Sequence, residues 1–209
     1  DLLFRDYTTE IPVEELSGSA TFLVLVFFLV IWIVLFWIAV SWHRFILLEE
    51  YPRGLFPVFR FDRILAYFGR ILLLGILAIV AMIPGFIFMV GLGQSTSLIA
   101  VLIFLIWVFA VMVCFFRLSI VLPAAAVGER LTLAQAWNST SGKTGDFVSL
   151  LVILFLFQIL IQLASSVLVI IPILGAVFVL FVSMLILPMI NVSILTTMYG
   201  HFIEKRDIN

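Results

Sequence analysis

The first long apolar run of this chain, residues 20–42, contains no charged residue. A helix of about 20 residues crosses the roughly 30 Å of hydrocarbon in a bilayer, so this run predicts a membrane-spanning helix. The whole chain has the same character: of its 209 residues, 65% are hydrophobic and 11% are charged. About a quarter of the residues in soluble domains are charged. A water-soluble fold of this size cannot bury so much apolar surface, and the bilayer must therefore be the solvent.

Four more apolar runs follow, separated by polar intervals and short turns. The predicted membrane helices cover residues 20–42, 71–90, 98–116 and 147–170, and a fifth runs from about residue 171 towards 199. We therefore predict an all-α fold, a polytopic membrane protein with about five transmembrane helices.

Two of the polar intervals resemble each other. Residues 44–70 and 117–143 have equal lengths, begin with arginine, and end on glycine followed by a basic residue. We interpret this as two parallel helix–linker–helix repeats. The odd fifth span is then either a lone helix or the partner of a helix before residue 1. The predicted segments are a polar N-terminal segment (1–19), repeat one (20–92, linker 43–70), repeat two (93–170, linker 117–146), and the fifth helix with a charged tail (171–209).

Both linkers contain signals for short helices and for binding. In the first linker, four side chains recur at the spacing of one helical face, which predicts an amphipathic surface helix suited to anionic lipid headgroups. In the second, Thr132 and Gln135 fit a capping box that opens a short helix. The candidate residues for headgroup or partner binding are Arg60, Arg63, Tyr67, Arg70, Arg117 and Lys143.

The basic residues are unevenly distributed over this topology. All of the 11 except Arg5 lie in the two linkers and the C-terminal tail. Because basic loops stay in the cytoplasm, we expect the linkers and the C-terminus to be cytoplasmic and the N-terminal segment to lie outside.

Polar residues inside the spans are few and uncharged. No Asp, Glu, Lys, Arg or His lies in the middle of a predicted span, which argues against a proton-driven carrier. Gln158 and Gln162 lie one turn apart on the fourth span, and Asn191 lies on the fifth. They form either a polar seam along a substrate path or hydrogen bonds between helices, and we favour the second interpretation.

The sequence predicts no catalytic residue, cofactor or metal site. Its one cysteine, Cys114, excludes a disulfide framework, and its acidic residues and histidines show no metal-ligand spacing. His43 and His201 both lie at the cytoplasmic ends of spans. We interpret them as interface anchors, while contact with a pigment or haem stays open.

Two stretches resemble known membrane proteins. AVSWHRFILLEE (39–50) and RLSIVLPAAAVGERLTLAQAWNSTSGKTGDFVSLL (117–151) are similar to a loosely defined group of uncharacterised bacterial multi-pass membrane proteins. The second also resembles the membrane domain attached to some glycerophosphodiester phosphodiesterases, where an Arg–Pro–Ala-Trp–Gly pattern follows a membrane helix. The resemblance implies an all-helical protein of the bacterial cytoplasmic (inner) membrane. It does not imply that enzyme activity, because the chain has no soluble region large enough for the catalytic domain.

We expect a non-enzymatic inner-membrane protein that acts as an accessory, assembly or scaffold subunit of a larger membrane complex. Its partners would be membrane lipids, anionic ones included, and other membrane subunits, but no nucleic acid. The alternative is a transporter or exporter of small molecules or lipids, with a polar path on the last two helices. A third hypothesis, an enzyme acting on lipid headgroups, requires the arginines of the first linker to converge with one of four acidic residues: Glu49, Glu50, Asp62 or Glu129.

Overall fold

The computed structural model describes residues 18–52, 54, 56–93, 97–168 and 171–206. The predicted N-terminal polar segment therefore lies almost entirely outside the described residues. The chain divides into two units, residues 1–35 and residues 36–209. The first unit holds the N-terminal part of one long apolar helix, and the second holds the rest of that helix and all the other elements.

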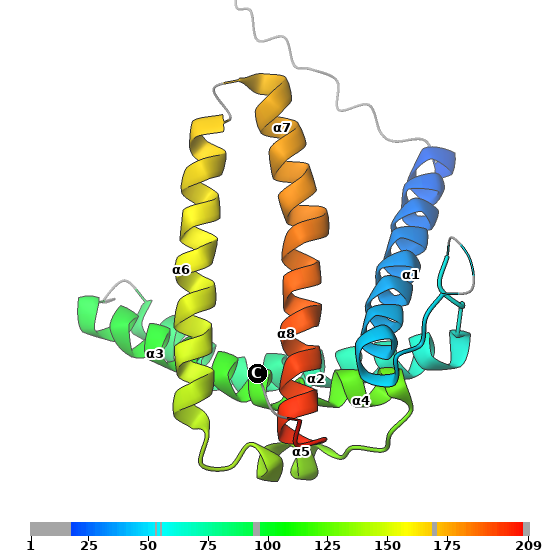
Figure 1. The fold of residues 1–209 in the computed structure, drawn as a ribbon. Helices are drawn as coiled ribbons and strands as arrows, with labels where there is room; N and C mark the ends of the chain where they lie inside the picture. Colours follow the sequence, from blue (N-terminus) through cyan, green and yellow to red (C-terminus); the bar gives the residue numbers. More distant parts are fainter. Residues whose placement is uncertain (1–17, 53, 55, 94–96, 169–170, 207–209) are drawn as a thin grey trace, which may run out of the picture. The chain divides into compact units, whose positions relative to one another are not determined.

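The described residues are helical and contain no strand (Figure 1). In chain order the elements are α1 (Gly18–Leu48), α2 (Phe61–Leu92), α3 (Leu98–Leu118), α4 (Val121–Val127), α5 (Leu133–Ser139), α6 (Thr144–Leu168), α7 (Pro172–Phe181), the π-helical η2 (Val182–Ile186) and α8 (Leu187–Phe202). Five helical stretches among them are long and apolar enough to cross a membrane. The predicted all-α fold with five candidate spans is confirmed.

The first linker differs from its prediction. We expected a surface helix followed by a separate membrane helix from residue 71, but α2 is one continuous helix from Phe61 to Leu92. Nothing in its sequence breaks it at that junction, since Gly69 lowers helix propensity without ending a helix. The described residues between 49 and 60 contain no helix. The second linker instead contains two short helices, α4 and α5.

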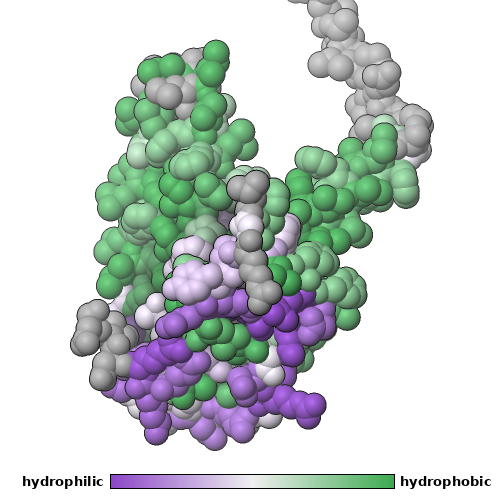
Figure 2. All heavy atoms as spheres, turned by 45° about the vertical axis from the view of Figure 1, so that its right-hand side comes forward, coloured by the Kyte–Doolittle hydropathy of each residue, from purple (hydrophilic) through white to green (hydrophobic). Residues whose placement is uncertain are grey.

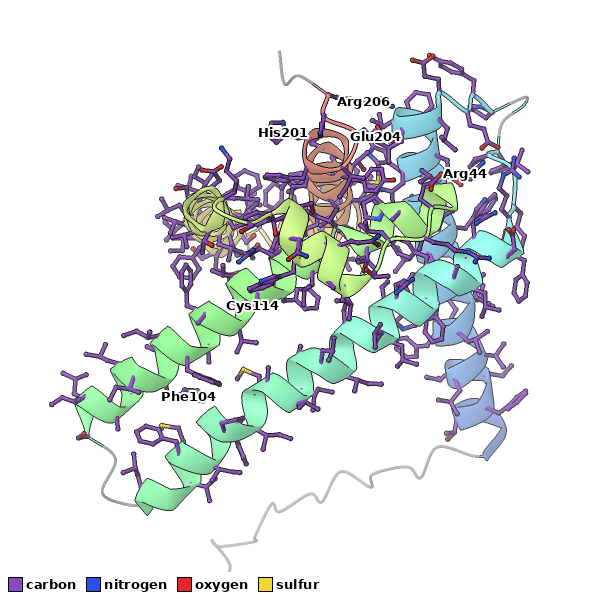
Figure 3. The ribbon with its side chains drawn as sticks, turned by 90° about the horizontal axis from the view of Figure 1, so that it is seen from below. Arg44, Phe104, Cys114, His201, Glu204 and Arg206 are labelled. Carbon is purple, nitrogen blue, oxygen red and sulfur yellow. The ribbon has the colours of Figure 1, made fainter. Side chains whose placement is uncertain are left out.

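Pro84 lies inside α2, where it removes a backbone N–H donor without ending the helix. The next residue, Gly85, leaves a notch that the indole of Trp107 on α3 fills. A Cβ added at Gly85 would lie 2.5 Å from Cδ1 of Trp107. The Trp107 Nε1–H group also donates to the carbonyl oxygen of Ala81, at 3.2 Å. Gly85 thus provides a packing contact within the hairpin of α2 and α3, which Figure 3 shows side by side.

The core of the second unit lies where the linkers meet the helices. Two adjoining clusters of buried residues draw side chains from the C-terminal part of α1, the first turns of α2, and α4, α6 and α8. Helix α4 is buried along most of its length, because the run Ala124–Ala126 lets α2 and α8 pack close to it. A segment that the sequence assigns to a surface linker is therefore part of the core.

The last span is one helical rod built from α7, η2 and α8. Pro172 is the first residue of α7, a position that proline favours. The π-helical turn of η2 ends at Ile186, two residues before Pro188, which lacks the N–H group that a regular helix would use there.

Candidate functional site

The segments between the helices are shorter than the predicted linkers 43–70 and 117–146. We keep the names first and second linker for the described residues of 49–60 and for residues 119–143, and we call these two segments and residues 203–206 together the linker base. On the face shown in Figure 2, hydrophilic residues gather at the end of the molecule where these segments lie. Apolar residues cover the helices that lead away from it. Arg60 and Lys143 lie in the linker base itself, and the other four candidate binding residues lie on α2 and α3.

Arginine side chains hold the linker base together by capping helix ends from other segments. The last carbonyl groups of a helix have no partner within the helix, and its C-terminus attracts cations. Arg206 donates through Nη2 to the carbonyl oxygen of Leu47, in the last turn of α1, at 2.8 Å. Its Nε lies 2.6 Å from a carboxylate oxygen of Glu204. The tail after α8 is thereby fixed to the end of α1 (Figure 3).

Arg44 forms the second of these caps. Its Nη1 donates to the carbonyl oxygen of Ala126, near the end of α4, at 3.1 Å. The same guanidinium pairs with Glu50, which also accepts a 2.7 Å hydrogen bond from Nη2 of Arg60. Burial alone would raise the pKa of the Glu50 carboxyl, but the hydrogen bonds and charges of Arg60 and Arg44 outweigh burial and lower that pKa below its ordinary value.

Arg117 forms the third cap, at the end of α5. It donates through Nη2 to the carbonyl oxygens of Trp137 and Thr140, at 3.1 and 3.3 Å, and through Nε to the hydroxyl oxygen of Thr140, at 3.0 Å. Its guanidinium also lies over the Trp137 ring, 3.7 Å from the centroid. Only 6% of the Arg117 surface is exposed. The donors of Arg117 thus serve the second linker, and its predicted contact with headgroups or partners stays a prediction.

Two of the predicted binding residues on α2 also face the protein. Tyr67 is 3% exposed, so it is not available to a headgroup, and the expectation that it binds headgroups is corrected. Arg63 pairs with Asp62 and lies against Gly128, where a Cβ would come within 2.5 Å of its Nη1. Gly128 has a φ of 100°, a backbone conformation that favours glycine. The sequence placed these side chains on one helical face correctly, but that face packs on the end of α4.

The other candidates are freer. Arg60 is bound to Glu50 but partly exposed. Arg70 is half-buried and has no hydrogen-bond or ionic partner among the described residues. Lys143 approaches Asp146 at 3.9 Å, and both side chains are more than half exposed. Of the candidate binding residues, Arg70 and Lys143 are therefore best able to meet a ligand outside the chain.

A buried polar chain joins α1, α2 and α8 just inside the linker base. His43 is fully buried, with Nδ1 2.7 Å from Oγ1 of Thr196 and Nε2 3.4 Å from the hydroxyl of Tyr67. The Thr196 hydroxyl donates to the carbonyl oxygen of Val192, so its oxygen accepts the Nδ1–H of His43. Nε2 then accepts from Tyr67. His43 is a packing residue of the core, not the interface anchor that the sequence suggested.

A groove of about 770 Å³ runs along α8, which we call the α8 groove. Its floor is one stripe of α8 and η2 with a residue at every fourth position: Leu185, Met189, Ser193, Thr197 and His201. Asp146 and Leu150 of α6 and Trp42 of α1 line its sides. His201 thus lies at a groove rim. We did not predict the groove from the sequence. The signal that could have indicated it is the change from apolar to polar residues at every fourth position of the last span.

The predicted polar seam is not assembled in this groove. Gln158 and Gln162 are exposed on α6, with no hydrogen-bond partner among the described residues, and neither lines the groove. Asn191 is exposed on α8 and donates to the carbonyl oxygen of Leu187, at 3.0 Å. None of the three meets a neighbouring helix through a hydrogen bond in the described part of the chain.

The cavity beside the paired charges of the first linker is small. Arg44 and Glu50 line a space of about 20 Å³, which is room for about one water molecule. Glu50 does converge with arginines, and its carboxylate is held in ion pairs with Arg44 and Arg60. Among the described residues, no three His, Cys, Asp or Glu side chains are placed to hold a metal ion.

Comparison with known proteins gives no further lead. No protein-family model, no curated protein and no solved structure matches this chain.

Proposed function

We propose that this chain is a non-enzymatic integral protein of the bacterial cytoplasmic membrane, and that it acts as an accessory, assembly or scaffold subunit of a larger membrane complex. The linkers and the C-terminus would be cytoplasmic, consistent with the basic residues gathered there. The resemblance of residues 117–151 to bacterial inner-membrane proteins supports the same location.

The observation that carries this proposal is the contrast between the linker base and the spans. The linker base is held by internal caps and ion pairs. In the most apolar stretch of each candidate span, by contrast, no more than 11% of the residues are buried within the chain. Lipid or other proteins must cover these faces. The exposed apolar side chains at the start of α1, from Phe22 to Val30, also need neighbours. A helix of a partner subunit would supply them.

Lipid contacts belong to the same proposal. Arg70 and Lys143 are the candidate cations least engaged by the protein, and they can attract anionic headgroups at the cytoplasmic surface. Arg60, Arg63 and Arg117 contribute mainly by holding the linker base in shape.

The test is to extract the protein from native membranes in a mild detergent and to analyse it by native electrophoresis with cross-linking. We expect a species larger than the monomer, with at least one co-purifying membrane protein. Phe28, 54% exposed on α1, supplies the variant. Phe28→Ala should lower partner recovery, and Phe155→Ala, a matched change at a 65% exposed position on α6, should lower it less. Recovery of the wild type as a lone monomer would contradict the proposal.

The α8 groove supports one alternative, a transporter or exporter of small molecules or lipids. The path would follow Ser193 and Thr197 rather than the predicted Gln158, Gln162 and Asn191. The alternative requires movement of a solute or lipid across the bilayer. Proteoliposomes that show no transfer of fluorescent lipids or small amphiphiles above the rate of protein-free vesicles would exclude it.

A further inference from the structure

We propose that the α8 groove is a binding site for a primary-amine phospholipid, of which phosphatidylethanolamine is the common example. The phospholipid would lie in the leaflet next to the linker base, with an acyl chain along the groove and the headgroup at its rim. This site goes beyond the proposed role as a subunit, and its test needs no partner protein.

The polarity of the groove matches the polarity of a lipid. Its far end is formed by apolar side chains of η2 and α8: Leu185, Ile186, Met189 and Ile190. Towards the linker base the lining becomes polar, through Ser193 and Thr197 to Asp146 and His201. A water-soluble ligand would not match the apolar end of the groove, which opens to the hydrocarbon of the bilayer. A plain hydrocarbon chain would not form hydrogen bonds with the polar end.

The length of the groove also suits one leaflet. Eight residues separate Leu185 from Ser193, which at 1.5 Å per residue is about 12 Å of apolar floor. The hydrocarbon of one leaflet is about 15 Å thick, half of the roughly 30 Å of a bilayer. The groove has a volume of about 770 Å³, within the roughly 300–1,000 Å³ typical of pockets for drug-sized ligands. A phospholipid in ordinary orientation would thus place its headgroup beside Thr197 and Asp146.

The chemistry of the rim favours a donor-rich headgroup. Ser193 donates its hydroxyl hydrogen to the carbonyl oxygen of Met189, at 2.8 Å, and Thr197 donates to that of Ser193, at 3.0 Å. Their oxygens keep lone pairs and can only accept further bonds. The Asp146 carboxylate is also an acceptor and carries negative charge.

A primary ammonium has three N–H donors and a positive charge, so it matches this acceptor-rich rim. Lys143, 3.9 Å from Asp146, is placed to attract the adjoining phosphate. Phosphatidylglycerol would bring a net negative charge to Asp146 without an ammonium group. Phosphatidylcholine would bring a cation without N–H donors.

The experiment uses the full chain, reconstituted into vesicles with equal amounts of phosphatidylethanolamine, phosphatidylglycerol and phosphatidylcholine, and analysed by native mass spectrometry. We expect phosphatidylethanolamine to be retained preferentially. Asp146→Asn should lower that preference about two- to fivefold, the size expected from losing an exposed ionic contact. Glu129→Gln, which removes an exposed acid outside the groove, should leave it unchanged.

A second variant tests the acyl-chain position. Ile190→Trp fills the groove and should abolish retention, whereas Ile153→Trp, at a 62% exposed position on α6 outside the groove, should not. Phosphatidylethanolamine with a photoreactive acyl chain should label residues 185–190. The proposal is overturned if phosphatidylglycerol or phosphatidylcholine is retained instead, if the wild type retains no lipid, or if Asp146→Asn has no effect. Because the chain is alone in the vesicles, failure here leaves the subunit proposal standing.

Discussion

Nδ1 of His43 and Oγ1 of Thr196 lie 2.7 Å apart, although 153 positions separate the two residues in the chain. This contact joins the end of the first span to the last one. It continues on one side to the hydroxyl of Tyr67 and on the other to the backbone of α8. The first, second and fifth spans therefore share a single chain of hydrogen bonds next to the linker base.

Removal of either neighbour of His43 should destabilise the packed body of residues 36–209. Buried hydrogen bonds between membrane helices contribute about 0.6 kcal/mol on average and up to about 1.7 kcal/mol. Thr196→Val and Tyr67→Phe should each lower the free energy of unfolding in detergent by about this amount. In a His43→Phe background the same two changes should have little further effect, because their shared partner is gone. Equal losses in both backgrounds would contradict the chain of bonds.

The contacts of Glu50 should depend on pH in the acidic range. Because its pKa is lowered in the folded protein, its contribution to stability is complete above the ordinary carboxyl value and is lost as the pH falls through the lowered one. Hydrogen exchange of residues 49–60 should therefore speed up on acidification. In Glu50→Gln the exchange should be faster at neutral pH and should change less on acidification. A wild-type linker whose protection is constant over that range would refute the prediction.

Loss of the cap that Arg206 forms on α1 should change the stability of the last turn of α1, far from Arg206 in the sequence. Arg206→Gln removes a cation and a donor from the last turn of α1, an interaction of about 0.3–1 kcal/mol. We expect a lower free energy of unfolding and faster hydrogen exchange in the last turn of α1. Lys205→Gln removes an equal charge from the neighbouring exposed position and serves as the control. If the two variants behave alike, general charge rather than capping is responsible.

The notch at Gly85 should reject any side chain. A Cβ there would lie 2.5 Å from the Trp107 ring, so Gly85→Ala should destabilise the α2–α3 hairpin by about 1–3 kcal/mol, as overpacking does. Gly75→Ala, also within α2, meets nothing within 4 Å and should be neutral or stabilising. Thermal unfolding of both variants checks this. Trp107→Leu should relieve the strain of Gly85→Ala, and a double variant no more stable than Gly85→Ala would argue against the contact.

Local signals in the sequence predicted the fold well. The uncharged runs gave the five candidate spans, because the length that crosses a bilayer is a property of each run alone. The capping box of Thr132 and Gln135 is present with both of its hydrogen bonds, because its two residues lie three positions apart. Arg63 and Tyr67 lie one turn apart on α2, as helical spacing predicts, whereas Arg60 precedes the helix.

What the sequence could not predict is what such side chains touch. From the sequence, Arg117 is a cation at the membrane interface, but in the structure it binds the last carbonyl groups of α5. Tyr67 is likewise expected at the surface, but its hydroxyl contacts His43. The burial of α4 depends likewise on helices far away in the sequence. The α8 groove requires side chains from three helices, although the change from apolar to polar side chains along its floor is visible in the last span alone.

The arginine cap on α1 also sets an order for the biogenesis of the protein. Arg206 follows the fifth span, whereas the helix end that it caps, at Leu47, belongs to the first. A chain emerging from the ribosome therefore inserts α1 long before its cap exists. Until the last span is made, the exposed carbonyl groups at Leu47 must be satisfied by water. The contact between the tail and α1 can form only after the last span is made, and truncation directly before residue 206 would leave all five candidate spans present without this cap.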